Sequence, residues 1–434
     1  MRTCPATFRM AAVSVACVAI ALPALARDSN DQSIWSRSKL TGDWRGLRKR
    51  AEDQGFTIDL TATYALQGVA SGGFDGPLFD RFSDENDVGN TLAGDLTLAL
   101  DTGKAGWWPG GSFNAEVEGR VGKSVLHRAG TVSAVNTDAT FPNVVDRFDE
   151  STIAVTNLTF TQYVGLYVSL FGGLVNGAEG DSNEFAGESL STSHFLNSAL
   201  LSSLVENATS PNTSLGGGLS FEPNEHVSGS FVVFGTEETA GENPFDPGDG
   251  ITFNPEWTLS YQLLQLGGAQ TFGFLYGIDA SRAAIATDPR LVLEGVLQGQ
   301  SAPTTNDDTW ALYYNAHQYV HGGDTGGWGV FVRFGLSDGD PNPIRWNMAA
   351  GFGGAGLVPI RPQDTWGMGT FYLGMSDEDL LRGLDVGDEV GGEVYYNIAL
   401  TPWFHLTLDA QGIDSALPGV DTTCVLGMRT NVDF

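Results

Sequence analysis

The chain has 434 residues and is strongly acidic, with 22 Lys and Arg against 52 Asp and Glu and a formal net charge of −30 at pH 7. This charge argues against nucleic acid or anionic phospholipid as a partner, because both repel a polyanion. Only 17% of the residues are charged, whereas 57 are Gly and 11% are aromatic. Beyond the N-terminus, no apolar run reaches the roughly 18 residues of a helical membrane span. This composition excludes a helical membrane protein and is typical of a β-barrel in a bilayer.

The N-terminus has the features of an export signal. Two Arg precede an apolar run at residues 10–22, and Ala24-Leu25-Ala26 has the small-x-small form of a cleavage site. We predict a signal peptide at residues 1–26. A membrane anchor is the alternative, but the apolar run is short for a spanning helix. Only Cys424 then remains in the exported chain, so no internal disulfide can form.

Residues 27–55 form a predicted N-terminal segment with a short helix, in the stretch LTGDWRGLRKRAEDQGF at 40–56. Asp43 can cap this helix and Gly55 can end it. The helix carries much of the scarce positive charge, at Arg45, Arg48, Lys49 and Arg50. A free helix of this kind could lie on a membrane surface. We expect it instead to pack at one mouth of the barrel, with its basic face towards acidic barrel residues.

The third predicted part, residues 56–434, is an all-β transmembrane antiparallel barrel. In FTIDLTATYALQ, the apolar residues from Phe56 to Leu66 alternate with polar ones, as in a strand with one apolar wall. The same pattern recurs sixteen times, at 56–67, 90–101, 112–122, 151–163, 166–176, 214–222, 227–236, 251–264, 271–280, 308–320, 327–337, 344–353, 364–375, 390–400, 403–413 and 420–434. An even strand number, with long links alternating with short ones, is the pattern of an outer-membrane barrel.

Several links carry further information. The links 338–343 and 354–363 do not fit the alternation, since the first is short for an outer loop and the second is long for a turn. The long link 177–213 contains Phe195, Leu200 and Leu201, which favours a loop folded into the lumen over one packed on the rim. Aromatic residues near strand ends predict a membrane girdle, with ordinary core packing as the alternative: Trp107, Trp108, Trp257, Trp328, Trp403 and Phe434.

The last strand, CVLGMRTNVDF, ends in Phe434, and a terminal aromatic is common on the closing strand of outer-membrane barrels. Its alternation places Arg429 on the lumen face and Cys424 on the lipid face. A barrel of sixteen strands leaves an aqueous channel rather than a filled interior. The strand number therefore predicts passive passage of small solutes.

Four segments resemble the carbohydrate-selective porins of the OprB family. They are LTGDWRGLRKRAEDQGF at 40–56, DSNEFAGES with HFLNSALL at 181–201, GFGGAGLVPIRPQDTWGMG at 351–369, and GGEVYYNIALTPWFHLTLDAQGID with VLGMRTNVDF at the C-terminus. The chain departs from the family at Leu408, where Pro is expected, and at Gly412, where an aromatic is common. The resemblance implies an outer-membrane channel that favours sugars such as glucose, with small neutral sugars and outer-membrane lipid as partners. A homo-oligomer is compatible with it.

A sugar-selective pore needs hydrogen-bonding groups at a constriction that bind weakly enough to release the solute. The strand alternation turns ten polar residues inward as candidate pore-lining or substrate residues: Asp59, Asp95, Glu116, Glu118, Arg120, Arg333, Glu393, Asp409, Gln411 and Arg429. A charged side chain on the lipid face would cost about 2–4 kcal/mol, which supports the assignment of these side chains to the inner face. The strongest candidates are Glu116, Glu118 and Arg120, as a cluster of both signs; solvated lumen residues without solute contact are the alternative.

Catalytic and cofactor motifs are absent from the sequence. It has no G-x-S-x-G elbow, no H-E-x-x-H, no P-loop and no Cys pair. His317 and His321 are four residues apart, but they lie along a predicted strand end and do not suggest a metal site. We therefore expect no enzyme, no cofactor and no metal. The alternative function is a general or cation-preferring small-solute porin without sugar selectivity.

Overall fold

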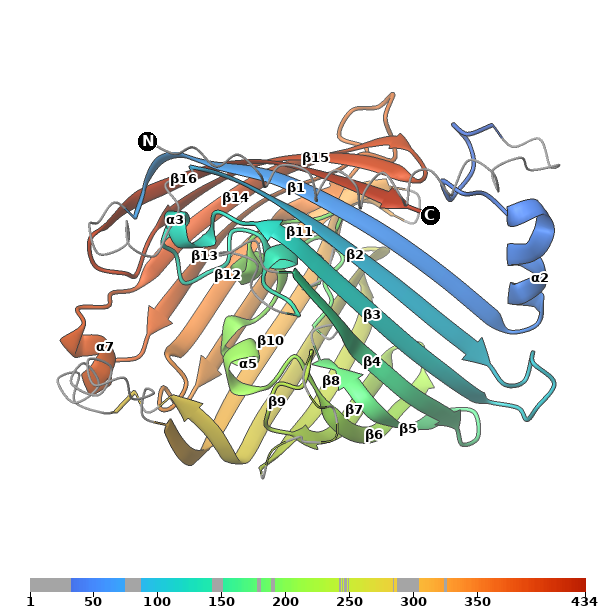
Figure 1. Ribbon diagram of the computed structural model, residues 1–434, viewed down its shortest axis with the longest axis horizontal. Coiled ribbons are helices and arrows are strands. Elements are labelled where there is room, and N and C mark those ends of the chain that lie inside the picture. Colours follow the sequence, from blue (N-terminus) through green and yellow to red (C-terminus); the bar gives the residue numbers. More distant parts are fainter. Residues whose placement is uncertain are drawn as a thin grey trace, which may run out of the picture.

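The computed structural model describes residues 33–74, 87–142, 151–177, 181–188, 192–241, 243, 245, 248, 250–283, 285–286, 304–323 and 326–434. The signal peptide predicted at residues 1–26 lies outside them. Sixteen antiparallel strands form one closed barrel, in which each strand pairs with its sequence neighbours and β1 pairs with β16 (Figure 1). Closure leaves no unpaired sheet edge. None of the helices in the described part of the chain is long and apolar enough to cross a membrane.

All sixteen predicted strands are present. Their bounds are β1 Phe56–Phe74, β2 Val88–Asp101, β3 Gly111–Lys123, β4 Ser151–Tyr163, β5 Val168–Asn176, β6 Thr213–Asn224, β7 Val227–Gly235, β8 Ile251–Leu263, β9 Leu266–Ala283, β10 Thr304–Gly323, β11 Gly326–Ser337, β12 Ile344–Ala355, β13 Thr365–Met375, β14 Glu389–Thr401, β15 Phe404–Asp414 and β16 Val420–Asp433. The helical elements are η1 Trp44–Gly46, α2 Leu47–Asp53, α3 Leu126–Ala129, η2 Thr137–Ala139, α4 Ser198–Leu201, α5 Leu204–Thr209 and α7 Asp379–Gly383.

The largest error in a strand boundary is at the end of β1, which continues to Phe74 rather than ending at 67. The next largest is at the start of β9, which begins at Leu266 rather than at 271, so residues 266–270 belong to the strand and not to the predicted link. The chain turns earlier, at Leu264 and Gln265, which both have positive φ (53° and 67°). Non-Gly residues rarely adopt this conformation, so the sequence contains no local signal for this turn.

The inward and outward faces follow the predicted alternation. On β3, Phe113 and Val121 are 39% and 42% exposed on the outer face, whereas Glu118 is fully buried inside. On β15, Leu408 is exposed and Gln411 is buried inside the barrel, and the strand continues unbroken through Gly412. The exposed large apolar side chains thus form the outer wall, as expected for a lipid-facing surface.

The two ends of the barrel differ. One end, called here the turn end, carries two-residue links such as 225–226 and 264–265; the other, the loop end, carries the long links. Figure 1 shows α2 at the turn end and α7 at the loop end. The exposed Trp107 and Trp108 lie in the β2–β3 link at the turn end, with ring centroids 6.0 Å apart. Their exposure supports the girdle and contradicts core packing.

The N-terminal segment packs at the turn end, as predicted, but its helix starts later. Trp44, Arg45 and Gly46 all have positive φ, so the regular helix begins only at Leu47. Arg48 donates a hydrogen bond to the carbonyl of Phe434 at 2.9 Å. Lys39, which precedes the helix, pairs at 2.8 Å with the barrel carboxylate of Asp59.

The two irregular links have structural explanations. In the short link 338–343, Asn342 Nδ2 donates hydrogen bonds to Val205 O and Thr209 Oγ1 inside the barrel, both at 2.9 Å. In the long link 356–364, Asp364 forms an ion pair with Arg361 and accepts a hydrogen bond from the Ala399 N–H at 3.0 Å. The first link holds an internal segment, and the second folds back on β14.

Candidate functional site

Two connections at the loop end turn into the lumen. We call residues 124–142, after β3, the first inward loop, and residues 181–188 with 192–210, between β5 and β6, the second inward loop. Backbone hydrogen bonds join them, from Thr137 N–H to Leu196 O at 3.0 Å and from Ser198 N–H to Ala134 O at 2.9 Å. The two loops therefore form one internal body.

Apolar packing fixes this body against the inner wall. Phe195 is fully buried, and its ring lies 5.6 Å from Phe331 and 4.9 Å from Tyr395, measured between centroids. Leu200 and Leu201 are also buried. The wall residues face inward on β11 and β14. The predicted infolded loop is thus confirmed, and packing on the rim is wrong for these side chains.

Strand β14 holds both inward loops through carboxylates. Glu393 accepts hydrogen bonds from the backbone N–H groups of Leu196-Asn197, both at 2.8 Å. Glu389, four residues earlier on the same face of β14, accepts them from Val132-Ser133 at 2.7 and 2.8 Å. Both carboxylates are buried, at 3% and 0% exposure. Hydrogen bonds from N–H groups to a charged acceptor are stronger than neutral ones, so these contacts are firm anchors.

A cluster of mixed charge forms on β2 and β3, but Arg120 pairs there with Asp95 and Glu118 rather than with the predicted Glu116. Arg120 donates to Asp95 at 2.6 Å and to Glu118 at 2.7 Å. Asp138 of the first inward loop covers the cluster and lies 3.8 Å from Arg429. Burial raises the pKa of the Asp138 carboxyl, while Arg429 and Arg120 lower it. Glu118 and Arg120 are almost fully buried, so the loop shields them from the open lumen.

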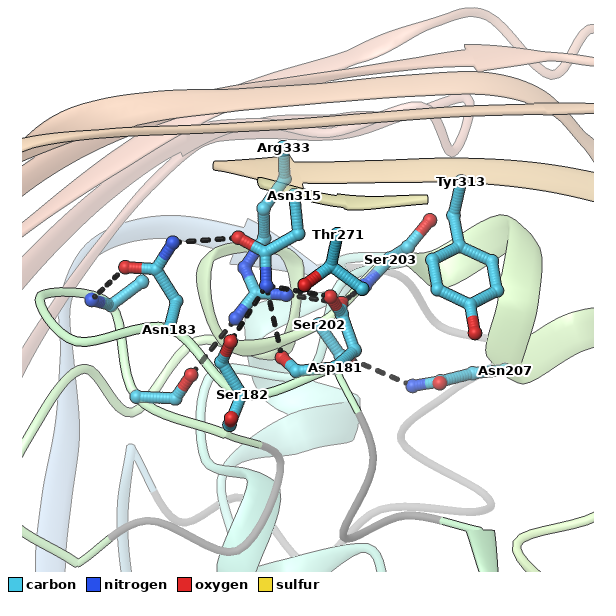
Figure 2. A network of polar contacts seen from close by, with 12 residues as sticks. Asp181, Ser182, Asn183, Ser202, Ser203, Asn207, Thr271, Tyr313, Asn315 and Arg333 are labelled. Carbon is cyan, nitrogen blue, oxygen red and sulfur yellow. Dashed lines mark hydrogen bonds and ion pairs between the residues drawn. The ribbon is translucent and has the colours of Figure 1, made fainter. Parts of the chain in front are cut away.

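Arg333 of β11 holds the second inward loop at its first described residue. Its guanidinium pairs with Asp181 and donates to Gly187 O at 2.8 Å. Asn315 of β10 donates to Asp181 Oδ1 at 2.8 Å and accepts from Asn183 at 2.6 Å. Figure 2 shows Arg333 and Asn315 reaching from the wall to the loop residues. Arg333 has no exposed surface and therefore serves the loop.

Four of the other predicted residues lie in different settings. Gln411 donates to Val135 O at 2.8 Å and accepts from Asn197, so it bonds both inward loops. Asp409 accepts from Gln411 at 3.0 Å, and a Cβ at Gly427 would lie only 1.8 Å from its carboxylate. A glycine is therefore needed opposite Asp409.

Arg429 donates to His194 O at 2.8 Å and is also buried. Glu116 accepts a hydrogen bond from Asn176 at 3.3 Å on the less covered part of the wall. The structure thus separates the ten candidates. Asp59, Asp95 and Glu116 keep exposed surface, whereas the remaining seven are 6% exposed or less.

Two cavities of the lumen lie beside β5–β10, and a third lies beside β10–β14. A loop-end cavity of about 140 Å³ is bounded by Glu206, Glu256 and Tyr313. A middle cavity of about 270 Å³ also touches Glu256 and includes Ser182. Ser182 is shared in turn with a turn-end cavity of about 500 Å³. The three cavities thus adjoin one another along the barrel.

Sequence reasoning did not select the residues of the two cavities beside β5–β10. They include Asn254, Glu256, Thr258, Thr271 and Asn315. The alternation that placed Glu118 inside would have placed these inside too, because Trp257 and Phe272 beside them are exposed outward. The signal was present, but no candidate was selected on β8, β9 or β10, although Glu256 is charged.

Comparisons with known proteins agree with this architecture. A family model described as carbohydrate-selective porin, OprB family, matches residues 85–434. Comparison with curated proteins gave no match. The high-pH structure of Pseudomonas putida OprB has a TM-score of 0.74 and 18% identity, covering 93% of this chain and 100% of that one. The low-pH structure of the same protein has a TM-score of 0.57 and 16% identity, covering 92% and 99%.

At these identities the solved structures show the fold alone, whereas the family model spans most of the chain. Channels of this family and fold are not enzymes. The chain belongs to the OprB family of carbohydrate-selective porins and is a bacterial outer-membrane channel for passive, carbohydrate-selective diffusion.

Proposed function

We propose that this porin passes glucose-type monosaccharides, and that they cross along the three cavities from the loop end to the turn end. The observation that carries the proposal is that neighbouring cavities share lining residues, since Glu256 belongs to the first two cavities and Ser182 to the last two.

The lining of this path suits a neutral, hydroxyl-rich solute. Thr258 and Thr271 share a hydrogen bond at 2.9 Å, and Asn254 donates to Phe274 O at 3.1 Å. Such groups can exchange their partners for sugar hydroxyls at little cost, so binding stays weak enough for release. Tyr319, in the turn-end cavity, offers aromatic surface for the apolar face of a sugar ring.

We further propose that the ten inward residues act on selectivity in two ways. The seven buried ones hold the inward loops and so set the width of the path. Asp59, Asp95 and Glu116 retain exposed surface and can meet a solute directly. Outer-membrane lipid is the proposed partner of the exposed apolar outer wall.

Liposome swelling tests the selectivity. Purified porin in liposomes should admit glucose faster than amino acids or salts of matched size. Equal rates for all solutes would instead favour a general porin, and the absence of swelling would exclude an open channel.

A blocking substitution tests the path. Thr271→Trp places a large ring in the middle cavity and should lower the glucose swelling rate severalfold. The matched control is Phe272→Trp, the next residue on the same strand, whose side chain is 44% exposed on the outer wall. If both variants swell like the wild type, the path does not run beside β9.

A further inference from the structure

Two carboxylates meet in the loop-end cavity without a cationic side chain. Glu206 comes from α5 in the second inward loop, and Glu256 comes from β8 in the wall; both line the same cavity. Within the described residues, no Lys, Arg or His forms an ion pair with either one. Arg333, which is close enough to influence Glu206, is already bonded to Asp181.

The cavity also holds oxygen atoms that lack hydrogen-bond partners. In the part of the chain that the structure describes, Glu206 Oε2 and Ser214 Oγ are both buried and without a hydrogen-bond partner. Glu206 is 9% exposed and Ser214 is 2% exposed, and both side chains line the cavity. An unsatisfied buried polar atom costs about 1–3 kcal/mol, and more when it is charged. Two such atoms at one cavity point to a ligand that the protein binds there.

Neighbouring strands of the wall hold the Glu256 side chain in place. Tyr313 of β10 donates its hydroxyl hydrogen to Glu256 Oε2 at 2.7 Å, across the intervening strand β9. Gly273 of β9 pairs with both Glu256 and Tyr313. A Cβ at Gly273 would lie 1.8 Å from the Tyr313 ring, so only glycine lets the ring cross β9. Asn254 Nδ2 donates to the Tyr313 hydroxyl at 3.3 Å, which completes the arrangement.

Electrostatics favours a positive ligand over a neutral one. Burial raises the pKa of the Glu206 carboxyl well above its usual range, and the neighbouring Asp181 and Glu256 carboxylates raise it further. A sugar hydroxyl could bond one oxygen but could not offset the charge of two carboxylates. A divalent cation could offset both charges. The raised pKa favours protonated Glu206 in the empty cavity, so cation binding would release that proton to water.

We propose that the loop-end cavity is a binding site for a hard divalent cation such as Ca²⁺, held by Glu206 and Glu256 with Ser214 as a neutral oxygen ligand. Carboxylate and neutral oxygens with added water are the ligands that Ca²⁺ uses in proteins. The cavity volume of about 140 Å³ leaves room for a cation and several waters. The described residues contain no group of three or more His, Cys, Asp or Glu that could hold a metal, so water must complete the coordination. The cation would bridge the second inward loop to the wall. Because this cavity is also the loop-end part of the proposed sugar path, cation binding would narrow that path.

Calcium binding to the folded porin tests this directly. The protein in a non-ionic detergent, stripped with a chelator, is titrated with Ca²⁺ by calorimetry and by equilibrium dialysis. We expect one saturable site per barrel in the wild type. Glu206→Gln and Glu256→Gln should each weaken binding by about tenfold or more, because each removes one of two charged ligands. Ser214→Ala should weaken it by a smaller factor.

The matched control is Glu184→Gln, a lumen carboxylate that lines the turn-end cavity instead. It should bind Ca²⁺ like the wild type. Heat-modifiable gel migration shows that each variant is a folded barrel, and Ser214→Ala provides a second test if a glutamate variant does not fold. The proposal is overturned if the wild type has no saturable site, or if all four variants bind with wild-type affinity. Equal weakening in Glu184→Gln would also overturn it, since binding would then reflect the overall negative charge.

Discussion

The two sides of the lumen have similar inward-facing residues, but these residues have different roles on each side. Beside β11–β16, several polar groups of the wall bond to the inward loops, as with Glu393 and the N–H groups of Leu196-Asn197. Beside β5–β10, polar groups such as Thr258 and Thr271 bond mainly to their neighbours and border open cavities. A lumen residue is therefore not a pore residue by position alone. What decides its role is whether an internal loop covers it.

The largest expected effect comes from releasing both loops from the wall. Glu389→Gln combined with Glu393→Gln keeps the side-chain shape but replaces each carboxylate with a neutral amide. Since hydrogen bonds to charged groups contribute about 1.5–3 kcal/mol each, both anchors should fail. We expect a neutral trisaccharide, excluded by the wild type, to enter liposomes at a rate near that of glucose.

Glu184→Gln serves as the control for this experiment. Glu184 accepts a hydrogen bond from Tyr319 and is not one of the two anchors on β14. If the double variant keeps the wild-type size limit, the β14 carboxylates do not hold the constriction and the contrast between the two sides fails.

A second effect concerns stability on the covered side. Arg333→Met leaves Asp181 buried without its cation, which should cost about 3–5 kcal/mol. The measurement is the unfolding midpoint from heat-modifiable gels. Adding Asp181→Asn should recover most of the loss, because no uncompensated charge then remains.

The matched control for this variant lies on the neighbouring strand. Arg345 of β12 pairs with Asp377 at 3.1 Å, but its side chain is 56% exposed. Arg345→Met should therefore cost less than about 1 kcal/mol. Equal losses of stability in Arg333→Met and Arg345→Met would mean that the burial of an ion pair does not affect its contribution.

The smallest expected effect is a pH dependence at His194, where the covered side meets the turn-end cavity. Burial, which has the largest effect, and the charge of Arg429 together lower the pKa of this imidazole to about 4. The unfolded chain then binds more protons than the folded one between about pH 6.5 and 4, so stability falls as the pH drops through this window. Because the ring is only half-buried, we expect a loss of about 1 kcal/mol by pH 4.

His194→Gln should flatten this pH dependence of the unfolding midpoint, and His226→Gln, at an exposed turn, should keep the wild-type slope. An unchanged slope in His194→Gln would assign the dependence to other groups.

The strands and their faces were predictable because their signal is local. Phe113 and Glu118 sit on opposite walls since neighbouring side chains of a strand alternate, and no distant contact can change that. The start of β9 and the start of α2 were not predictable in the same way. Both depend on non-Gly residues in left-handed conformations, at Leu264 and Arg45, which only the surrounding structure stabilises.

The sequence by itself determined which side chains point into the barrel, and it indicated through Phe195 and Leu200 that a loop folds inward. Only the tertiary structure decided that Arg333 and Glu393 bond to that loop while Thr271 and Glu256 border open space. The physical reason is that orientation follows from the two-residue period of a strand. Whether an internal loop covers a side chain depends on contacts between residues more than a hundred positions apart, such as Asp181 with Arg333. No local sequence pattern encodes such contacts.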